Sequence, residues 1–313
     1  MNREIYHIDS KTEKYIVFTP RNAETEKFPV MFVMHGGSAT PYIAEWYGFV
    51  EEAAKRGYMV VIPEWEASLN KEQEAGVKAS GLDSYEAYAA KKVIDELLDN
   101  GYPMDTTRMY VAGISGGGNA AAYIATGLPE YFAASSPATG AAIQGNGVAT
   151  ASSDKSVYEQ LAGVREYGGQ AMMMIYGLWD SEYRWPVTEN VVEGGFKANN
   201  LTVADRIENV NTWFASCGSV KKPETTESVA ALIAENNGKA SSYFGINFDN
   251  EYSKTYEVQY YFGDSYNENG DTIVRYMAIE NGPHFVSPMW ASEFYDFCEH
   301  YRRDSETHML IIE

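Results

Sequence analysis

Residues 108–125, RMYVAGISGGGNAAAYIA, contain the pattern that decides the fold. An apolar stretch, expected to be a strand, leads through Gly113-Ile-Ser-Gly-Gly117 into an alanine-rich stretch, expected to be a helix. A G-x-S-x-G sequence between a strand and a helix is typical of a nucleophile elbow, a sharp turn that exposes the serine at the edge of the sheet. The sequence therefore predicts Ser115 as a nucleophile and the Gly116 N–H as an oxyanion donor. A glycine-rich, anion-binding turn is the alternative interpretation.

Strands and helices are expected to alternate on both sides of this turn. Apolar runs predict strands at residues 15–18, 29–34, 58–62, 108–113 and 170–176. Helical patterns predict helices at residues 44–56, 84–99 and 119–125, with Ser84 as the N-cap of the second. Because continuous apolar runs suit strands that are buried on both faces, we expect an α/β fold with a mostly parallel central sheet flanked by helices.

The alternation is interrupted after the fifth predicted strand. Residues 181–253 contain Gly and Asn pairs and two helical patterns, at about 203–214 and 224–236. We expect this segment to be a lid-like insertion within a single catalytic domain that spans residues 1–313. Afterwards, residues 255–262 and 272–279 predict a hairpin around Asn267-Glu-Asn-Gly270, and residues 292–303 predict a final amphipathic helix.

A second glycine-containing loop follows the strand that ends at Met34. This loop reads His35-Gly-Gly-Ser38, and its glycines allow the backbone to approach a reacting carbonyl group. The N–H of Gly37 or of Ser38 is the predicted second oxyanion donor, and the sequence does not choose between them. His35 precedes the nucleophile along the chain, so we expect it to brace the loop and not to act as the base.

A serine nucleophile requires a general base and a carboxylate that orients the base. Of the five histidines, His284 is the one in a loop that follows the predicted acid, in the order Ser, acid, His that suits this arrangement. A surface histidine is the alternative role for His284. Asp180, just after the strand at 170–176, is the predicted acid, with Glu182 and then Asp264 as alternatives.

With these residues, the chain resembles α/β-hydrolases and, among them, the group of poly(3-hydroxybutyrate) depolymerases and feruloyl esterases. The resemblance rests on residues 29–37, 105–117, 132–140, 177–180 and 282–284, and on Trp213, Cys217 and Pro223. It implies a serine carboxylesterase that acts through an acyl-enzyme, with Ser115, Asp180 and His284 as the triad. A polyester depolymerase-like hydrolase and a serine peptidase with the same triad are the alternatives.

Two departures from that group narrow the expected substrate. Gly37-Ser38 stands where many secreted members carry a cysteine, and the chain has no linker or polymer-binding domain. Soluble esters are therefore expected in preference to solid polyester.

Aromatic residues lie close in sequence to the predicted catalytic motifs. They suggest a pocket for an aromatic acyl group, such as a hydroxycinnamate, although short-chain esters and a simple packing role are alternatives. The candidates are Trp46, Trp179, Tyr183, Trp185, Phe285 and Trp290.

Composition excludes several classes of partner. The chain has 313 residues, and 44 acidic against 24 basic side chains give a formal charge of −20. Such a balance disfavours nucleic acids and anionic membrane surfaces, and it favours neutral over anionic esters. Two cysteines are too few for a metal cluster, and Cys217 and Cys298 are either two thiols or one disulfide. Because hydrolysis through an acyl-enzyme needs neither, we expect no metal and no organic cofactor. The N-terminus has no signal-peptide pattern, which predicts a cytoplasmic protein, the alternative being a secreted protein whose leader has been removed.

Overall fold

The structure is a computed structural model of the chain. It describes residues 1–7, 13–21, 26–65, 76, 84–139, 163–177, 218, 239–244, 255–279, 284 and 288–313. Of the predicted elements, the helices at 203–214 and 224–236 lie outside the described residues.

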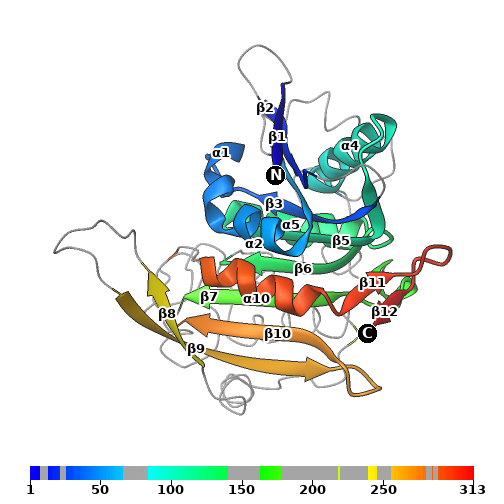
Figure 1. The fold of residues 1–313 in the computed structure, drawn as a ribbon. Helices are drawn as coiled ribbons and strands as arrows, with labels where there is room; N and C mark the ends of the chain where they lie inside the picture. The colour runs from blue at the N-terminus through cyan, green and yellow to red at the C-terminus, as the bar shows by residue number, and fades with distance from the viewer. Residues whose placement is uncertain are drawn as a thin grey trace.

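The described residues form one large mixed sheet with helices on both faces (Figure 1). Its strand order is β1-β2-β4-β3-β5-β6-β7-β10-β9-β8. The central strands from β4 to β10 run parallel to one another, and β1, β2, β9 and β8 pair antiparallel at the two sides. The strands are β1 (Asn2–His7), β2 (Glu13–Thr19), β3 (Phe28–Met34), β4 (Met59–Pro63), β5 (Met104–Ile114), β6 (Phe132–Ala138), β7 (Ala171–Gly177), β8 (Lys239–Phe244), β9 (Thr255–Tyr266) and β10 (Thr272–Ile279).

Two hydrophobic cores lie on the two faces of this sheet. On one face, α2 (Phe49–Arg56) and α10 (Pro288–Cys298) pack together, and on the other face α4 (Tyr85–Asp99) packs against α5 (Gly116–Gly127). The parallel strands β3 and β5 send alternate side chains into each core. This arrangement confirms the predicted α/β fold with a mostly parallel central sheet.

The helix predicted at 44–56 is divided into three parts. A short α1 (Pro41–Ala44) continues into the 3₁₀ turn η1 (Glu45–Tyr47), and α2 begins at Phe49. Gly48 separates η1 from α2 because its φ of 92° is left-handed, a conformation that a helix interior does not contain.

The last helix ends earlier than predicted. α10 ends at Cys298, and Tyr301–Arg303 form β11, which pairs with β12 (Leu310–Ile312). The prediction of a helix to residue 303 was wrong because Tyr301 and Arg303 alternate with a less buried residue, as in a strand. The apolar residues were recognised correctly, but their period was not.

Local signals placed several other boundaries well. The Ser84 hydroxyl accepts a hydrogen bond from the Ala87 N–H (3.0 Å), so Ser84 is the N-cap of α4 as predicted. The predicted hairpin is formed by β9 and β10, with a turn closed by the Asn267 N–H and the Asp271 carbonyl oxygen (2.9 Å). β6 was not predicted from its composition, since its small residues lack the β-branched side chains that mark strands.

Only part of the predicted insertion at 181–253 is described. These residues are Gly218 and Lys239–Phe244, and the latter form β8 at the edge of the sheet, antiparallel to β9. The end of the predicted insertion therefore belongs to the sheet itself.

A buried arginine joins β11 to the start of β6 and to the turn before β7. The Arg303 side chain is fully buried, and its guanidinium donates to the carbonyl oxygens of Phe132 (2.9 Å), Tyr167 (2.8 Å) and Gly169 (3.0 Å). Burial lowers the pKa of Arg303 to about 10, so the side chain is still protonated at neutral pH. These bonds hold three segments together at the amino ends of the strands.

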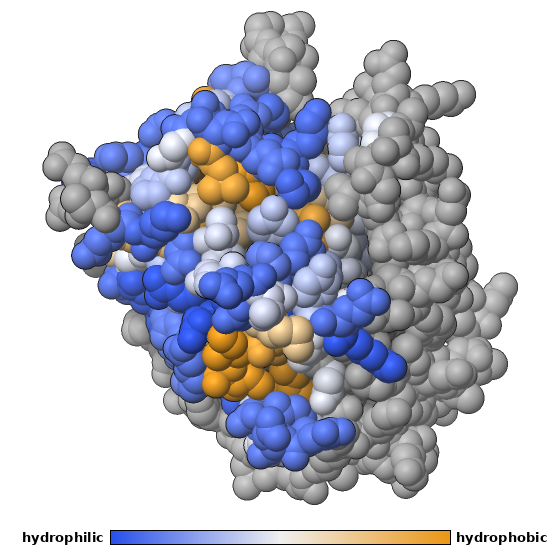
Figure 2. Space-filling model, turned by 90° about the vertical axis from the view of Figure 1, so that its right-hand side faces the viewer, coloured by the Kyte–Doolittle hydropathy of each residue, from blue (hydrophilic) through white to orange (hydrophobic). Residues whose placement is uncertain are grey.

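The side of the molecule that carries the C-terminus faces the viewer in Figure 2, where the described surface is largely hydrophilic with two apolar patches. Among the described helices, none is both long enough and apolar enough to cross a bilayer.

Candidate active site

Ser115 occupies the turn between β5 and α5. Its backbone has φ 58° and ψ −124°, a region in which a residue with a side chain is strained. Its N–H donates to the Ala138 carbonyl oxygen (2.9 Å), and its own carbonyl accepts from the Asn119 N–H (3.1 Å). The side chain is partly exposed and does not cap the helix. The turn therefore has the backbone geometry of a nucleophile elbow.

The glycines around Ser115 are required by close backbone contacts. A Cβ at Gly113 would lie 2.0 Å from the Gly117 carbonyl oxygen, and a Cβ at Gly117 would lie 2.2 Å from the His35 carbonyl oxygen. Both distances are well below any real contact of a Cβ atom, and the opposing atoms are backbone atoms that cannot turn aside. The two glycines thus allow β5, α5 and the loop after β3 to meet.

The loop after β3 approaches the start of α5. A Cβ at Gly116 would lie 3.0 Å from the Gly37 backbone nitrogen, so the two residues are in close contact. Gly116 is the first residue of α5, and the N–H groups at a helix N-terminus attract negative charge. Ser38, the next residue, has a left-handed φ of 59°. The contact brings the predicted donors on the two segments together.

Several side chains hold this loop from behind. His35 is fully buried, with Nδ1 2.9 Å from the Gly36 carbonyl oxygen and Nε2 3.2 Å from Glu64 Oε1. The Trp65 indole N–H donates to the His35 carbonyl oxygen (2.9 Å), and the Gly36 N–H donates to the Tyr47 hydroxyl (3.4 Å). Burial raises the pKa of the Tyr47 hydroxyl, against a smaller opposite effect of that N–H. His35 therefore braces the loop, as expected.

The central strands end in register at the edge that carries Ser115. Ile114 of β5 pairs with Ala138 of β6, which in turn pairs with Ile175 of β7. Gly177 at the end of β7 pairs with Ile279 at the end of β10. In Figure 1 the arrowheads of β6, β7 and β10 accordingly point to the same side. Residues that follow these strands emerge at one edge of the sheet.

The predicted base and acid follow two of these strands. His284 comes after β10 and is half-buried. Asp180 and its alternative Glu182 come after β7 in the sequence, but both lie outside the described residues. The topology thus places the chain that leads to each predicted triad member at the same edge of the sheet.

Asp264 has a structural role. It lies buried on β9, and both of its carboxylate oxygens accept hydrogen bonds from the Arg275 guanidinium (2.7 and 2.8 Å). The cross-strand pair of Asp264 and Arg275 belongs to the β9–β10 hairpin near the start of β10. Asp264 is therefore removed from the candidates for the catalytic acid.

The predicted aromatic contacts have different surroundings. Trp46 on η1 is 81% exposed, whereas Trp290 is fully buried in α10, where it packs edge-on against Phe49 and donates to the Ser136 hydroxyl (2.7 Å). We assign Trp290 to the core, not to a substrate pocket. The other four candidates, Trp179, Tyr183, Trp185 and Phe285, lie outside the described residues.

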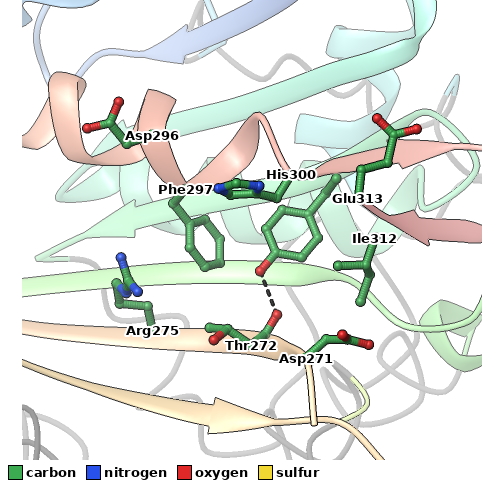
Figure 3. A pocket seen from close by; sticks show the side chains of 9 residues that line it. Asp271, Thr272, Arg275, Asp296, Phe297, His300, Ile312 and Glu313 are labelled. Carbon is green, nitrogen blue, oxygen red and sulfur yellow. Dashed lines mark hydrogen bonds between the residues drawn. The ribbon is translucent and has the colours of Figure 1, made fainter. Parts of the chain in front are cut away.

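A pocket of about 290 Å³ lies at the other end of the sheet, where β10 begins (Figure 3). Three carboxylates surround it, and on its floor the Tyr301 hydroxyl donates to the Thr272 carbonyl oxygen (2.5 Å). It is lined by Asp271, Thr272, Arg275, Asp296, Phe297, His300, Tyr301, Ile312 and Glu313. Because His284 follows the opposite end of β10, this pocket is separate from the candidate active site.

Glu64 and Trp65 were not predicted from the sequence. Both follow β4 at the same edge as Ser115, and an acidic residue directly after a central strand was the available signal. No group of three or more metal-ligating side chains is found among the described residues.

Comparison with known proteins gives a family for this chain. The model of the Esterase family matches residues 10–261. The structure of the acetyl xylan esterase from Aspergillus awamori aligns with a TM-score of 0.53 at 13% identity, covering 96% of this chain and 99% of that one. A ferulic acid esterase aligns with a TM-score of 0.46 at 13% identity, covering 95% and 97%.

An S-formylglutathione hydrolase from Staphylococcus aureus aligns with a TM-score of 0.41 at 16% identity, over 57% of this chain and 80% of that one. Among curated proteins, no match is found. The family match covers most of the chain, and the acetyl xylan esterase shares its fold. The chain therefore belongs to the Esterase family and is a carboxylic ester hydrolase, a serine esterase with the α/β-hydrolase fold.

Proposed function

We propose that this esterase acts by acyl transfer to Ser115, with His284 as the general base and Asp180 as the residue that orients it. The observation that carries the proposal is the strained φ of Ser115 at the end of β5, directly before the N-terminus of α5. Such a turn presents a serine hydroxyl beside unbonded helix N–H groups, which is what attack on a carbonyl group requires.

The reaction proceeds in two steps. His284 accepts the proton of the Ser115 hydroxyl while the oxygen attacks the ester carbonyl carbon, and the protonated imidazole then gives that proton to the departing alcohol. A water molecule, deprotonated by His284, then attacks the carbonyl carbon of the acyl-enzyme. The bond from that carbon to the Ser115 oxygen breaks, the acid is released, and the imidazolium returns the proton to Ser115. Asp180 stabilises the imidazolium in both steps. No other co-reactant is needed.

The negative oxygen of each tetrahedral intermediate is bound by two backbone N–H groups. We assign these to Gly116 and Gly37, because the contact between these residues supports Gly37 over Ser38 as the second donor. Each such donor contributes about 10²- to 10³-fold in rate in serine hydrolases. Hydrogen-bond donors fixed before the substrate arrives favour the intermediate over the ester itself.

The proposed substrates are soluble, neutral esters with an aromatic or short acyl chain. The net charge of −20 disfavours anionic esters, and the aromatic residues near the motifs suggest a hydroxycinnamoyl group. Methyl ferulate, p-nitrophenyl acetate, a peptide anilide and a suspended polyester form a panel that separates the candidates. A clear preference for the acetyl ester would reject the hydroxycinnamoyl assignment, and a preference for the anilide or polyester would reject the ester class proposed.

Active-site labelling tests the nucleophile. A fluorophosphonate probe should label the intact protein and the Ser84→Ala control, because Ser84 is the N-cap of α4 and not the predicted nucleophile. Ser115→Ala should remain unlabelled and lose at least about 10⁴-fold in kcat/KM. A folded wild-type protein that is not labelled would contradict the proposal.

Two matched substitutions test the acid. Asp180→Asn should lower kcat by about 10⁴-fold, because an amide holds the imidazole in the wrong tautomer. Glu182→Gln, which removes the neighbouring charge, should leave kcat nearly unchanged. The reverse result would transfer the role to Glu182.

A further inference from the structure

Three residues that hold the loop at residues 35–38 suggest a role beyond the triad and the two proposed oxyanion donors. His35, Glu64 and Trp65, which we call the loop brace, come from the ends of β3 and β4. All three side chains are buried or nearly so, at 0%, 9% and 9% exposure. None of them belongs to the proposed triad, and their contacts converge on the backbone that carries Gly37.

The hydrogen-bond partners of His35 fix the position of one proton. The Gly36 carbonyl oxygen can only accept, so Nδ1 donates to it across 2.9 Å. The second ring nitrogen, Nε2, lies 3.2 Å from Glu64 Oε1, so the Glu64 carboxyl group holds the ring from its other side. Glu64 thereby keeps the ring in the orientation in which Nδ1 faces the Gly36 carbonyl oxygen.

That bond orients the peptide group between Gly36 and Gly37. The Gly36 carbonyl oxygen and the Gly37 N–H belong to one planar trans peptide, in which they point in opposite directions. The carbonyl oxygen is held by the His35 ring and also accepts from the Ala39 N–H (3.3 Å). The Gly37 N–H is therefore directed away from His35, and the Gly37 nitrogen lies in contact with Gly116.

Trp65 connects the two sides of the proposed oxyanion site. Its indole N–H donates to the His35 carbonyl oxygen (2.9 Å), and its Cη2 atom lies 3.3 Å from where a Cβ of Gly116 would stand. The backbone before it is fixed as well, since the Glu64 N–H donates to the Lys14 carbonyl oxygen of β2 (2.9 Å). The brace is thus tied to the sheet.

We propose that Glu64 and Trp65 are positioning residues for ester hydrolysis. Through His35 they hold the Gly36–Gly37 peptide so that its N–H meets the negative oxygen of the intermediate. A hydrogen bond to the Gly36 carbonyl also polarises that peptide and strengthens its N–H as a donor. This inference rests on the proposed function, because it requires an oxyanion at that place.

Three substitutions test the brace. Trp65→Phe removes the indole N–H and keeps a ring. Glu64→Leu removes the partner of Nε2. Glu64→Gln keeps a partner, because its amide N–H can donate to Nε2 while Nδ1 stays protonated. Tyr110→Phe is the matched control, since it deletes a buried hydroxyl that donates to the Tyr301 carbonyl oxygen (2.8 Å).

The measurements are kcat and KM for p-nitrophenyl acetate, the inhibition constant of a phenyl trifluoromethyl ketone, and the melting temperature. The ketone forms a tetrahedral adduct with a serine, so its affinity reports on the oxyanion site. Trp65→Phe and Glu64→Leu should lower kcat about 10- to 100-fold, with KM nearly constant, since a misaligned donor weakens only the transition state. The inhibition constant should rise by the same factor.

Glu64→Gln should stay within about threefold of the wild type, because it preserves the alignment of the donor. Tyr110→Phe should keep both constants while its melting temperature falls. Unchanged kcat and inhibition constants in Trp65→Phe and Glu64→Leu, with only lower melting temperatures, would overturn the inference. So would an equal loss in Glu64→Gln and Glu64→Leu. A failure of the proposed function itself would give a different result, because the Ser115→Ala protein would then still hydrolyse esters.

Discussion

The turn at Ser115 and the site of Arg303 are both places where segments distant in sequence meet. They differ in whether the backbone polar groups at the meeting point are hydrogen-bonded within the protein. At Ser115, glycines let backbone contact backbone, and the Gly37 nitrogen lies in contact with Gly116, the first residue of α5. At Arg303, one side chain donates to carbonyl oxygens of the β6 start and of the turn before β7.

The difference reflects what each end of the sheet has to do. A backbone donor can serve a substrate only if the protein fixes its direction without using its hydrogen. A buried carbonyl in a structural joint, by contrast, is costly unless it is bonded. The carboxyl edge therefore contains a strained backbone and fixed donors, whereas at the amino edge the Arg303 side chain bonds the carbonyl groups that the joint buries.

The largest expected effect is that of Gly117→Ala. A methyl group there would lie 2.2 Å from the His35 carbonyl oxygen and 2.5 Å from the Met34 carbonyl oxygen, so β3 and α5 would have to separate. We expect a loss of about 3 kcal/mol or more in unfolding free energy and the loss of esterase activity. Urea unfolding measures the first and p-nitrophenyl acetate hydrolysis the second.

Gly163→Ala is its control, since no described atom lies within 4 Å of the added methyl group. Equal stabilities of the two variants would show that the close approach at Gly117 is not required.

Arg303→Met should be nearly as destabilising but leave the chemistry intact. The substitution removes a donor to several buried carbonyl groups, which costs about 3–4 kcal/mol in unfolding free energy. The kcat of the folded fraction should not change, because the joint lies at the opposite end of the strands. Arg302→Met, which breaks an exposed pair with Glu313, should change neither quantity measurably. A selective fall in kcat would contradict the separation of the two ends.

Ser115→Gly should raise stability while it abolishes activity. Glycine adopts the φ of 58° without strain, which should add about 1 kcal/mol to the unfolding free energy. Thermal unfolding of Ser115→Gly and Ser115→Ala distinguishes strain from loss of the hydroxyl, since only glycine relieves the backbone. A lower melting temperature for glycine than for alanine would contradict strain at the turn.

The smallest expected effect is that of Ser84→Ala. At the start of α4, the Ser84 hydroxyl accepts a hydrogen bond from the Ala87 N–H. At the start of α5, the Ser115 side chain makes no such capping bond. The loss of this cap should cost about 1 kcal/mol in unfolding free energy, with unchanged kcat. If Ser115→Ala destabilised the protein as much as Ser84→Ala, Ser115 would be a cap and not a presented nucleophile.

Sequence reasoning found the parts of this molecule that depend on neighbours along the chain. The elbow at Ser115, the cap at Ser84 and the hairpin turn at Asn267 each depend on a few consecutive residues. The strands of the central sheet were found because their apolar runs are continuous.

Contacts between distant residues were not found. The Glu64 carboxylate meets His35 across 29 positions, and the Arg303 guanidinium meets Phe132 across 171. Neither Glu64 nor Arg303 has a local pattern that marks it as buried, so two members of the loop brace, Glu64 and Trp65, were missed and the final helix was predicted too long. Trp290 illustrates the same limit, because closeness in sequence to His284 suggested a pocket where the fold supplies a core.

The burial of Cys298 gives the protein a built-in reporter of local opening. This free thiol lies in α10, its Sγ donates weakly to the Tyr295 carbonyl oxygen (3.6 Å), and burial raises its pKa. A thiol reagent needs an exposed thiolate, so it can react with Cys298 only after α10 has left the sheet. In a Cys217→Ser background, the rate of alkylation would therefore report the rate at which α10 detaches from the sheet. A melting curve, by contrast, reports the unfolding of the whole molecule.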